Sequence, residues 1–384
     1  MKVFYDEDSL LHNPPYEILD GHLVHYYESP LRPQNIKHEL ESSPSFTIHP
    51  TNKALDVLKH ARKVHSEDYL HYLETAYAGW VADGGDKVPP PPIVALTSPG
   101  PLGQTAVLPE AFPHPKMLPR PPVADPGGLG AIARAGFYCF DLSCPITADT
   151  HKSALASART ALSAAEALST NYPPHSPKSG IFALCRPPGH HAGTALCGGY
   201  CFLNNASIAA RFLQDTDPSI NSGSTQKLRI AILDIDYHHG NGTQEIFYED
   251  PSVLYVSLHA QDDYPYYTGS KAETGSGAGL GCTHNHPLPR GTADDGYLTE
   301  LQHALAEIRE FAPAYVLVSL GVDTYVDDPI SDFKLTRAGY TRVGRAIAHL
   351  NRPTLFVMEG GYHIETIGKN VRAVLEGFEA EEPV

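Results

Sequence analysis

The sequence predicts an α/β fold in which an open parallel sheet is flanked by helices. Three observations support this prediction: short apolar runs recur along the chain, helical patterns lie between them, and polar motifs follow the ends of the runs. Strands of a parallel sheet are buried on both faces and therefore have continuous apolar sequences, while the intervening helices supply the crossovers that parallel pairing requires. A chain of 384 residues can form one such sheet in one domain.

The predicted strands share short apolar stretches rich in β-branched residues, which is typical of buried strands. They are residues 181–185, 229–234, 253–259, 315–320 and 354–359. Three helices are predicted from apolar residues that recur on one helical face. The first helix follows Thr150, a candidate N-cap, and its apolar face is formed by Leu155, Ala158, Leu162, Ala165 and Leu168. The apolar face of the second is formed by Leu298, Leu301, Leu305 and Ile308. That of the third is formed by Val343, Ile347 and Leu350.

One segment breaks this regular pattern. Between Pro89 and Gly130 the sequence is dense in Pro and Gly, which disrupt both helices and strands. It predicts a long loop, and the alternative is a linker between two domains. Because the chain before it is too short and helical for a core of its own, we expect a single domain over residues 1–384 with the loop inserted at 89–130. A polar surface segment is predicted at 214–226.

Composition narrows the classes of partner. The chain has 28 Lys and Arg against 44 Asp and Glu, for a formal charge of -16, which argues against binding to nucleic acid and is compatible with a cationic small substrate or with solubility alone. The six cysteines form no CxxC motif and are expected to be reduced thiols. The N-terminus lacks the apolar run of a signal peptide, and no stretch approaches the roughly 20 apolar residues of a membrane span. We therefore expect a cytoplasmic protein without a membrane partner.

Polar motifs follow four of the predicted strands. They are RPPGHH after residue 185, DIDYHHGNG from 234, GVDT after 320 and EGGY from 359. In open parallel sheets the carboxyl ends of the strands form the edge where ligands bind. We therefore expect these motifs to meet in one site.

The second of these motifs predicts a metal site. Asp234, Asp236 and His238 recur at steps of two, so their side chains point to one side of an extended strand end, and Asp323 adds a carboxylate from another strand. Two carboxylates and one imidazole suit a catalytic Zn²⁺ with an open position for water. The alternative is a pair of charged residues that cap a strand.

Two other motifs supply groups for acid–base chemistry. His190 and His191 follow a Pro-Pro-Gly sequence that restricts their backbone, and one imidazole can accept a proton while the other stabilises charge. Tyr362 follows two glycines, from which a phenol can donate to an oxyanion. The alternatives are a surface histidine pair and an ordinary turn tyrosine.

These motifs together resemble the zinc-dependent deacetylase superfamily of the arginase/deacetylase fold, which includes the histone deacetylases. The residues that carry the resemblance are RPPGHHAG, GGYCFLNNA, DIDYHHGNGTQEIFY, SLGVDT with DDPIS, and MEGGY. The N-terminal MKVFYDEDSLLHNPPYEILDGHLV with HYYESPLRP after it, and the segments GFYCFDLSCPIT and YPYYTGSKAETGSGAG, resemble the acetylpolyamine amidohydrolase branch. The resemblance covers nearly the whole chain except the Pro-rich loop and the polar segment.

The resemblance implies a role for each site residue. It implies that Asp236, His238 and Asp323 bind Zn²⁺, that His191 is the general base with His190 as its electrostatic partner, that Asp234 orients His190, that Asn241 makes a neutral hydrogen bond to His191, and that Tyr362 is the oxyanion donor.

It also implies structural cations and a substrate channel. A K⁺ ion is expected at Asp234, Asp236, His238, Ser257 and Leu258, and a second one near Phe247, Asp250 and Val253. Gly199, Tyr200 and one of Tyr264, Tyr266 or Tyr267, with Tyr266 the choice, are expected to line the channel for an acyl-amine.

Selectivity for a polyamine requires an acid near the site. The acid that some polyamine-selective relatives carry is absent at Ile330, although Asp327 and Asp328 are nearby. We expect Glu17 to attract the distal ammonium of a polyamine; the alternative is that Glu17 is a solvated surface acid.

The expected reaction is hydrolysis of an acetylated polyamine or a related acyl-amine to acetate and a free amine. The alternatives are an acetyl-lysine protein deacetylase, a noncatalytic binder of acylated ligands, and a dimanganese urea hydrolase, which needs more Asp and His ligands than these motifs offer. The resemblance further implies a homodimer formed through the 89–130 loop region.

Overall fold

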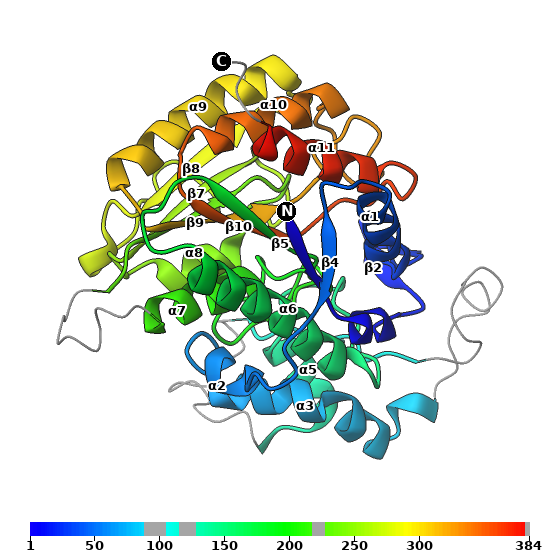
Figure 1. Ribbon diagram of the computed structural model, residues 1–384. Helices are drawn as coiled ribbons and strands as arrows, with labels where there is room; N and C mark the ends of the chain where they lie inside the picture. The colour runs from blue at the N-terminus through cyan, green and yellow to red at the C-terminus, as the bar shows by residue number, and fades with distance from the viewer. Residues whose placement is uncertain (88–104, 115–127, 217–226, 381–384) are drawn as a thin grey trace.

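A computed structural model describes residues 1–87, 105–114, 128–216 and 227–380, and its centre is an eight-stranded sheet (Figure 1). The strand order is β4-β1-β5-β10-β9-β6-β7-β8, and every neighbouring pair is parallel. The strands are β1 (Lys2–Tyr5), β4 (Thr47–Pro50), β5 (Ser179–Ala183), β6 (Ile230–Asp234), β7 (Val253–Ala260), β8 (Thr283–Leu288), β9 (Tyr315–Leu320) and β10 (Pro353–Met358). A separate antiparallel hairpin pairs β2 (Glu17–Leu19) with β3 (His22–Val24).

Helices cover both faces of the sheet (Figure 1). One layer contains α1 (Leu31–Glu41), α9 (Asp294–Phe311), α10 (Arg337–Ala348) and α11 (Ile367–Glu379). The other contains α2 (Val57–Ala61), α3 (Glu67–Ala82), α5 (Ala131–Phe137), α6 (Thr150–Asn171), α7 (Asn205–Asp215) and α8 (Asn241–Phe247). Short 3-10 turns lie at Glu7–Leu11, Gly85–Lys87 and Gly277–Gly279.

The hydrophobic core lies on both faces of the central strands. Every residue of β6, β7, β9 and β10 is buried, as the continuous apolar runs predicted. The apolar face of α6 is buried through Ala158, Leu162 and Leu168. Asp149 rather than Thr150 is the N-cap of this helix; Thr150 begins it, and its hydroxyl accepts a hydrogen bond from the Thr147 amide (2.8 Å). Burial of these apolar strands stabilises the sheet, and their close packing makes it rigid, which fixes the position of the strand ends at its edge.

All five predicted strands are confirmed, but the two strands of the hairpin and three further strands of the main sheet were not predicted. β1 and β4 have four residues each, too few for a clear periodicity, and β8 is an edge strand whose sequence THNHPL is polar and contains Pro. β1 lies between β4 and β5, with Lys2 opposite both Thr47 and Ile181. The N-terminal segment is thus part of the sheet.

The two irregular segments are described only in part. In the Pro-rich region, Val107 forms an antiparallel bridge with Ile146, with N···O distances of 2.8 and 3.0 Å. Most of the predicted loop, and with it the predicted dimer contact, lies outside the described residues. Gln214 belongs to α7 and is buried, where its side-chain amide donates to Leu228 O and Ser252 Oγ, so the polar segment begins later than predicted.

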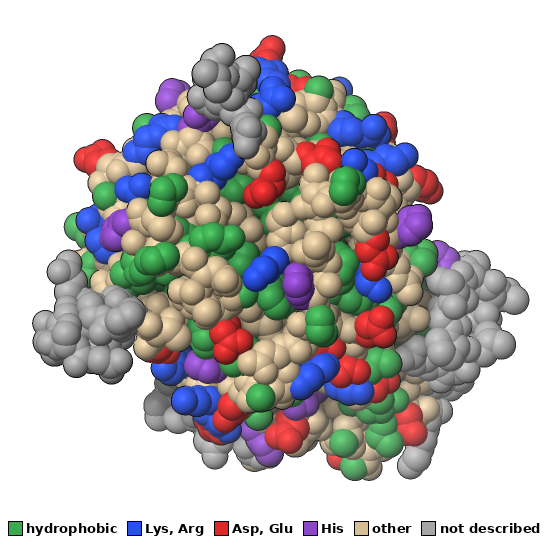
Figure 2. All heavy atoms as spheres, viewed as in Figure 1, with side chains coloured by type: hydrophobic (Ala, Val, Ile, Leu, Met, Phe, Trp, Pro, Cys, Tyr) green, Lys and Arg blue, Asp and Glu red, His purple; other side chains and the backbone are tan. Residues whose placement is uncertain are grey.

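The described surface is mixed in charge. Acidic and basic side chains are interspersed on the face drawn in Figure 2. Within the described ranges, no helix combines the length and hydropathy needed to cross a membrane.

Candidate active site

The four polar motifs meet at the carboxyl edge of the sheet, where β5, β6, β9 and β10 end. Glycines allow their close approach: a Cβ on Gly360 would lie 2.4 Å from Asp323 Oδ2 and 2.6 Å from Asp236 Oδ2. At Gly199, whose φ is +54°, a Cβ would lie 2.2 Å from the His191 ring. Only glycine fits such positions, which explains why these motifs contain it.

Asp236, His238 and Asp323 form a candidate metal centre. One ligand atom from each lies within 4.8 Å of the others, and all three residues are buried. His238 Nδ1 lies 3.3 Å from Asp236 Oδ1 and 3.1 Å from Asp323 Oδ2. Backbone amides hold the carboxylates, since Tyr237 N donates to Asp323 (2.9 Å) and Gly360 N to Asp236 (2.8 Å).

The electrostatics of this centre favour a bound cation. Burial raises the pKa of Asp323 to about 6, and the adjacent Asp236 carboxylate adds to the rise. Burial opposes a charge on His238, yet hydrogen bonds to the two carboxylates raise its pKa to about 10. Two buried carboxylates and one imidazole aimed at one point match the donor set of a catalytic zinc site, so the residues fit this metal.

His190 and His191 lie side by side, with ring centres 4.0 Å apart, in different environments. His190 Nδ1 is 3.1 Å from Asp234 Oδ2, and although burial opposes its charge, Asp236 and Asp234 raise its pKa to about 10. His191 Nδ1 donates to Asn241 Oδ1 at 2.7 Å, which leaves Nε2 with a free lone pair. Burial, then repulsion from His190 and His238, holds the His191 pKa well below its usual range.

Tyr362 is a buried side chain on the opposite side of the centre. Its ring contacts Tyr200 at 5.5 Å between centroids, and the Arg32 guanidinium lies 4.9 Å from the ring centre. Burial raises the pKa of the phenol well above its usual range, so the hydroxyl keeps its proton and can act as a donor.

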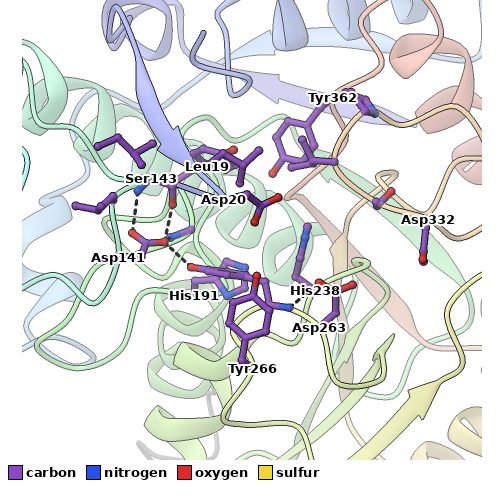
Figure 3. A pocket seen from close by; sticks show the side chains of 18 of the residues that line it. Leu19, Asp20, Asp141, Ser143, His191, His238, Asp263, Tyr266, Asp332 and Tyr362 are labelled. Carbon is purple, nitrogen blue, oxygen red and sulfur yellow. Dashed lines mark hydrogen bonds between the residues drawn. The ribbon is translucent and has the colours of Figure 1, made fainter. Parts of the chain in front are cut away.

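One residue of each of these groups lines a cavity of about 600 Å³ (Figure 3). These three residues, His191, His238 and Tyr362, are buried, and Asp20, Tyr266, Arg290 and Asp332 belong to the same lining. Gly199 and Tyr200 also line it, as predicted for substrate-binding residues.

The three candidate wall tyrosines lie at different places. Tyr264 is nearest the chemistry, with its ring 5.1 Å from that of His191 and its hydroxyl donating to Asp141 Oδ2 at 2.6 Å. Tyr266 lines the cavity but is 59% exposed, and Tyr267 is 92% exposed and is not part of the lining. Tyr264 therefore fits the inner wall better than Tyr266, the residue that the sequence favoured.

Glu17 is neither a solvated surface acid nor a cavity residue. It is fully buried, accepts a hydrogen bond from the Tyr27 amide (2.8 Å), and burial raises its pKa to about 8. The residue of the same hairpin that reaches the cavity with a carboxylate is Asp20, at the turn between β2 and β3. The position of Glu17 therefore does not fit the predicted contact with a substrate ammonium.

The residues predicted to form each K⁺ site lie close together in the structure. Asp234 on β6 pairs in register with Ser257 on β7, beside the buried Leu258, and the Ser257 hydroxyl contacts His259 Nδ1 at 2.9 Å. For the second site, Asp250 N donates to Phe247 O (3.0 Å) and Val253 N to Asp250 O (3.4 Å).

Several buried residues that support the site were not predicted. Arg32 donates to Gly361 O (2.6 Å) and pairs with Glu28, which also binds Arg186 (3.0 Å). Glu359 accepts hydrogen bonds from the amides of Gly189 (2.7 Å) and His190 (3.2 Å). Arg186 and Glu359 lie within the motifs that follow the strands, and Glu28 and Arg32 lie within the HYYESPLRP segment of the family resemblance, but no role was assigned to any of the four. Asp328, taken above only as a nearby acid, accepts a hydrogen bond from the Tyr362 amide (2.7 Å).

Comparison with known proteins agrees with this geometry. The family model described as histone deacetylase domain matches residues 26–378. Acetylpolyamine amidohydrolase 1 of Pseudomonas aeruginosa is 40% identical over 99% of both chains, and the acetylpolyamine amidohydrolase of Mycoplana ramosa is 38% identical over 98% of this chain and 99% of its own. The crystal structure of an acetylpolyamine aminohydrolase from Burkholderia pseudomallei superposes with a TM-score of 0.82 at 34% identity, covering 99% of each chain. The predicted arginase/deacetylase fold is thereby confirmed, and the chain belongs to the histone deacetylase domain family, together with these acetylpolyamine amidohydrolases.

Proposed function

We propose that this protein hydrolyses the acetyl amide of acetylated polyamines or related acyl-amines. The observation that carries the proposal is the meeting, in one cavity, of a candidate metal centre, a neutral imidazole and a buried phenol. Near-full-length similarity to acetylpolyamine amidohydrolases supports the substrate class. Acetate and a free amine are the products.

In this proposal Asp236, His238 and Asp323 hold one Zn²⁺, as is general in the family. A zinc ion there supplies Lewis acidity toward the acetyl carbonyl and lowers the pKa of water. The fit rests on the converging buried ligand atoms.

The protein's own residues then perform the proton transfers. His191 Nε2, for which the described part of the chain provides no hydrogen-bond partner, accepts a proton from the attacking water. The charged His190, held by Asp234, stabilises the negative charge that develops beside it. The Tyr362 hydroxyl donates to the oxyanion of the tetrahedral intermediate, and His191 returns the proton to the departing amine.

The cavity suits a linear acyl-amine. The Tyr264 and Tyr200 rings and Gly199 line the part next to His191, which fits an aliphatic chain. Farther along the lining, Asp332 and Asp263 pair with Arg290 at 2.6 and 3.5 Å, and the Asp141 carboxylate accepts hydrogen bonds from Ser143, Gly199 and Tyr264.

Asp20 differs from Asp332, Asp263 and Asp141 because it is an exposed acid at the tip of a hairpin that lines the cavity. We therefore propose Asp20, in place of Glu17, as the group that attracts the distal ammonium.

Three further properties belong to the proposal. The 1–384 chain acts as one domain, K⁺ ions occupy the two sites around Ser257 and Asp250, and the 89–130 region contributes to a homodimer. The family resemblance supports each of them. Potassium titration of thermal stability and light scattering of the purified protein test the ion and dimer predictions separately.

One kinetic panel tests the proposed reaction. Zinc-reconstituted protein is assayed with N-acetylputrescine, N-acetylspermidine and an acetyl-lysine peptide. We expect kcat/KM to be highest for the acetylated polyamines. A preference for the peptide would instead support the acetyl-lysine deacetylase alternative, and the absence of turnover with all three, despite a full complement of zinc, would support the noncatalytic binder.

A further inference from the structure

A buried carboxylate outside the cavity joins two parts of the active site. Asp328 is 7% exposed and does not line the cavity. Its Oδ2 accepts a hydrogen bond from the Tyr362 amide at 2.7 Å, and its Oδ1 accepts one from the Ile330 amide at 3.2 Å. Its own amide donates to Tyr325 O at 3.0 Å, which anchors Asp328 in the loop that follows β9.

The backbone before Tyr362 needs such an anchor. Gly361 has a φ of +123°, a conformation that glycine adopts at no steric cost, so the turn is not fixed by its own side chains. External groups fix each part of it: Asp236 accepts from Gly360 N at 2.8 Å, and Arg32 donates to Gly361 O at 2.6 Å. The Tyr362 amide, the last of these polar groups, is fixed by Asp328.

The second hydrogen bond of Asp328 extends this control to the cavity wall. Ile330 lines the cavity and packs against the buried cluster of Tyr26, Tyr200 and Tyr362. One carboxylate therefore sets the relative position of the wall residue and of the phenol. Burial raises the pKa of Asp328 to about 8, but the hydrogen bonds from the Tyr362 and Ile330 amides favour the ionised form, in which both oxygens are acceptors. A side-chain amide cannot reproduce this arrangement because one of its two ends is a donor.

We propose that Asp328 is a positioning residue for Tyr362. It acts by holding the Tyr362 backbone so that the phenol reaches the oxyanion. This inference rests on the proposed function, in which the Tyr362 hydroxyl is the oxyanion donor.

A double-mutant cycle of Asp328→Asn and Tyr362→Phe tests the inference. In the wild-type background, Asp328→Asn should lower kcat for N-acetylputrescine by about 10- to 100-fold, the cost of misplacing a group by about an ångström, with a smaller change in KM. In the Tyr362→Phe background the same substitution should change kcat by no more than about twofold, since residues that act through one another are not additive. Asp327→Asn is the matched control, because Asp327 is exposed next to Asp328 in the same loop.

A binding measurement separates this inference from the proposed reaction. The probe is a trifluoromethyl ketone analogue of N-acetylputrescine, whose hydrate mimics the tetrahedral intermediate. Its affinity should fall in Asp328→Asn by about the same factor as kcat, and should be insensitive to Asp328→Asn once Tyr362 is Phe. Failure of the wild type to hydrolyse acetylated amines would contradict the proposed function, while this binding cycle would still decide the role of Asp328.

Zinc content and melting temperature of each variant accompany the cycle. If Asp328→Asn does not fold, Asp328→Ser, whose hydroxyl still accepts one N–H, replaces it in the same cycle. Wild-type kcat and probe affinity in the Asp328 variant would overturn the proposal. Equal losses with and without the Tyr362 hydroxyl would also overturn it, because they would show that Asp328 does not act through Tyr362.

Discussion

Replacing Tyr362 with Phe removes one hydroxyl and leaves the packing of the ring in place. The ring keeps its contacts with Tyr200 and with the Arg32 guanidinium. Within the described residues no protein group bonds to the Tyr362 hydroxyl, so its removal leaves no buried donor or acceptor without a partner. We therefore expect a change of at most about 0.5 kcal/mol in the free energy of unfolding.

The catalytic cost should be far larger than the structural one. A single donor to an oxyanion is worth on the order of 100- to 1000-fold in kcat, or about 3–4 kcal/mol in the activation free energy. Because this interaction forms mainly in the transition state, kcat should fall while KM changes little. The assay is steady-state hydrolysis of N-acetylputrescine by protein with a measured zinc content.

A tyrosine outside the cavity provides the control for this variant. Tyr267 is 92% exposed, so Tyr267→Phe should retain wild-type kcat and stability. If Tyr362→Phe has normal zinc content and the wild-type kcat, the oxyanion donor must be another group. If its melting temperature falls sharply, the hydroxyl has a structural role that the geometry does not show.

Two further predictions concern substrate charge and pH. Asp20→Asn should lower kcat/KM for N-acetylspermidine relative to that for an acetyl amide with a neutral tail, most clearly at low salt. Glu17→Gln, which alters a buried acid outside the cavity, should leave this ratio of kcat/KM values unchanged. Equal ratios for wild type and Asp20→Asn would refute the role of Asp20. Both ring nitrogens of His286 contact carboxylates, Glu300 at 2.8 Å and Glu307 at 2.9 Å, and although burial opposes its charge, these contacts raise the His286 pKa. The stabilisation of the folded state by these two ion pairs should therefore be complete below the ordinary histidine pKa of about 6.5 and should be lost as pH rises through the raised pKa of His286. His286→Gln should accordingly lower the free energy of unfolding more at pH 6 than at pH 9. An equal loss at both pH values would contradict this prediction.

The central strands and the site residues could be predicted because each has a local signal. Apolar runs indicate buried strands, and the polar motifs that follow them predict that Asp236 and Asp323 converge. In the structure Asp323 accepts a hydrogen bond from the amide of Tyr237, the residue after Asp236, across a separation of 86 residues. The glycines that permit this approach, such as Gly360, lie in the same motifs.

The remaining features depend on contacts that no local pattern records. β1 is a strand because its neighbours Thr47 and Ile181 lie beside it, not because its four residues have a clear period. Arg32 binds Gly361, which is 329 residues away, and a lone arginine early in a helix gives no indication of that. Glu17 is buried and accepts a hydrogen bond from the Tyr27 amide, and its negative charge alone could not indicate that burial.

The metal content of Asp323→Ala tests the central claim most directly. Wild-type protein reconstituted with zinc and freed of excess metal should contain about one zinc ion per chain, held by two carboxylates and one imidazole. Loss of a residue that hydrogen-bonds to a metal ligand typically weakens metal affinity by roughly 10- to 100-fold, and loss of the ligand itself should weaken zinc affinity by more than that. Asp323→Ala should therefore lose both its zinc and its activity. Asp327→Ala, which removes an exposed acid from the same loop, should keep both. Undiminished zinc and hydrolysis in Asp323→Ala would contradict the assignment of this centre as the site of the reaction.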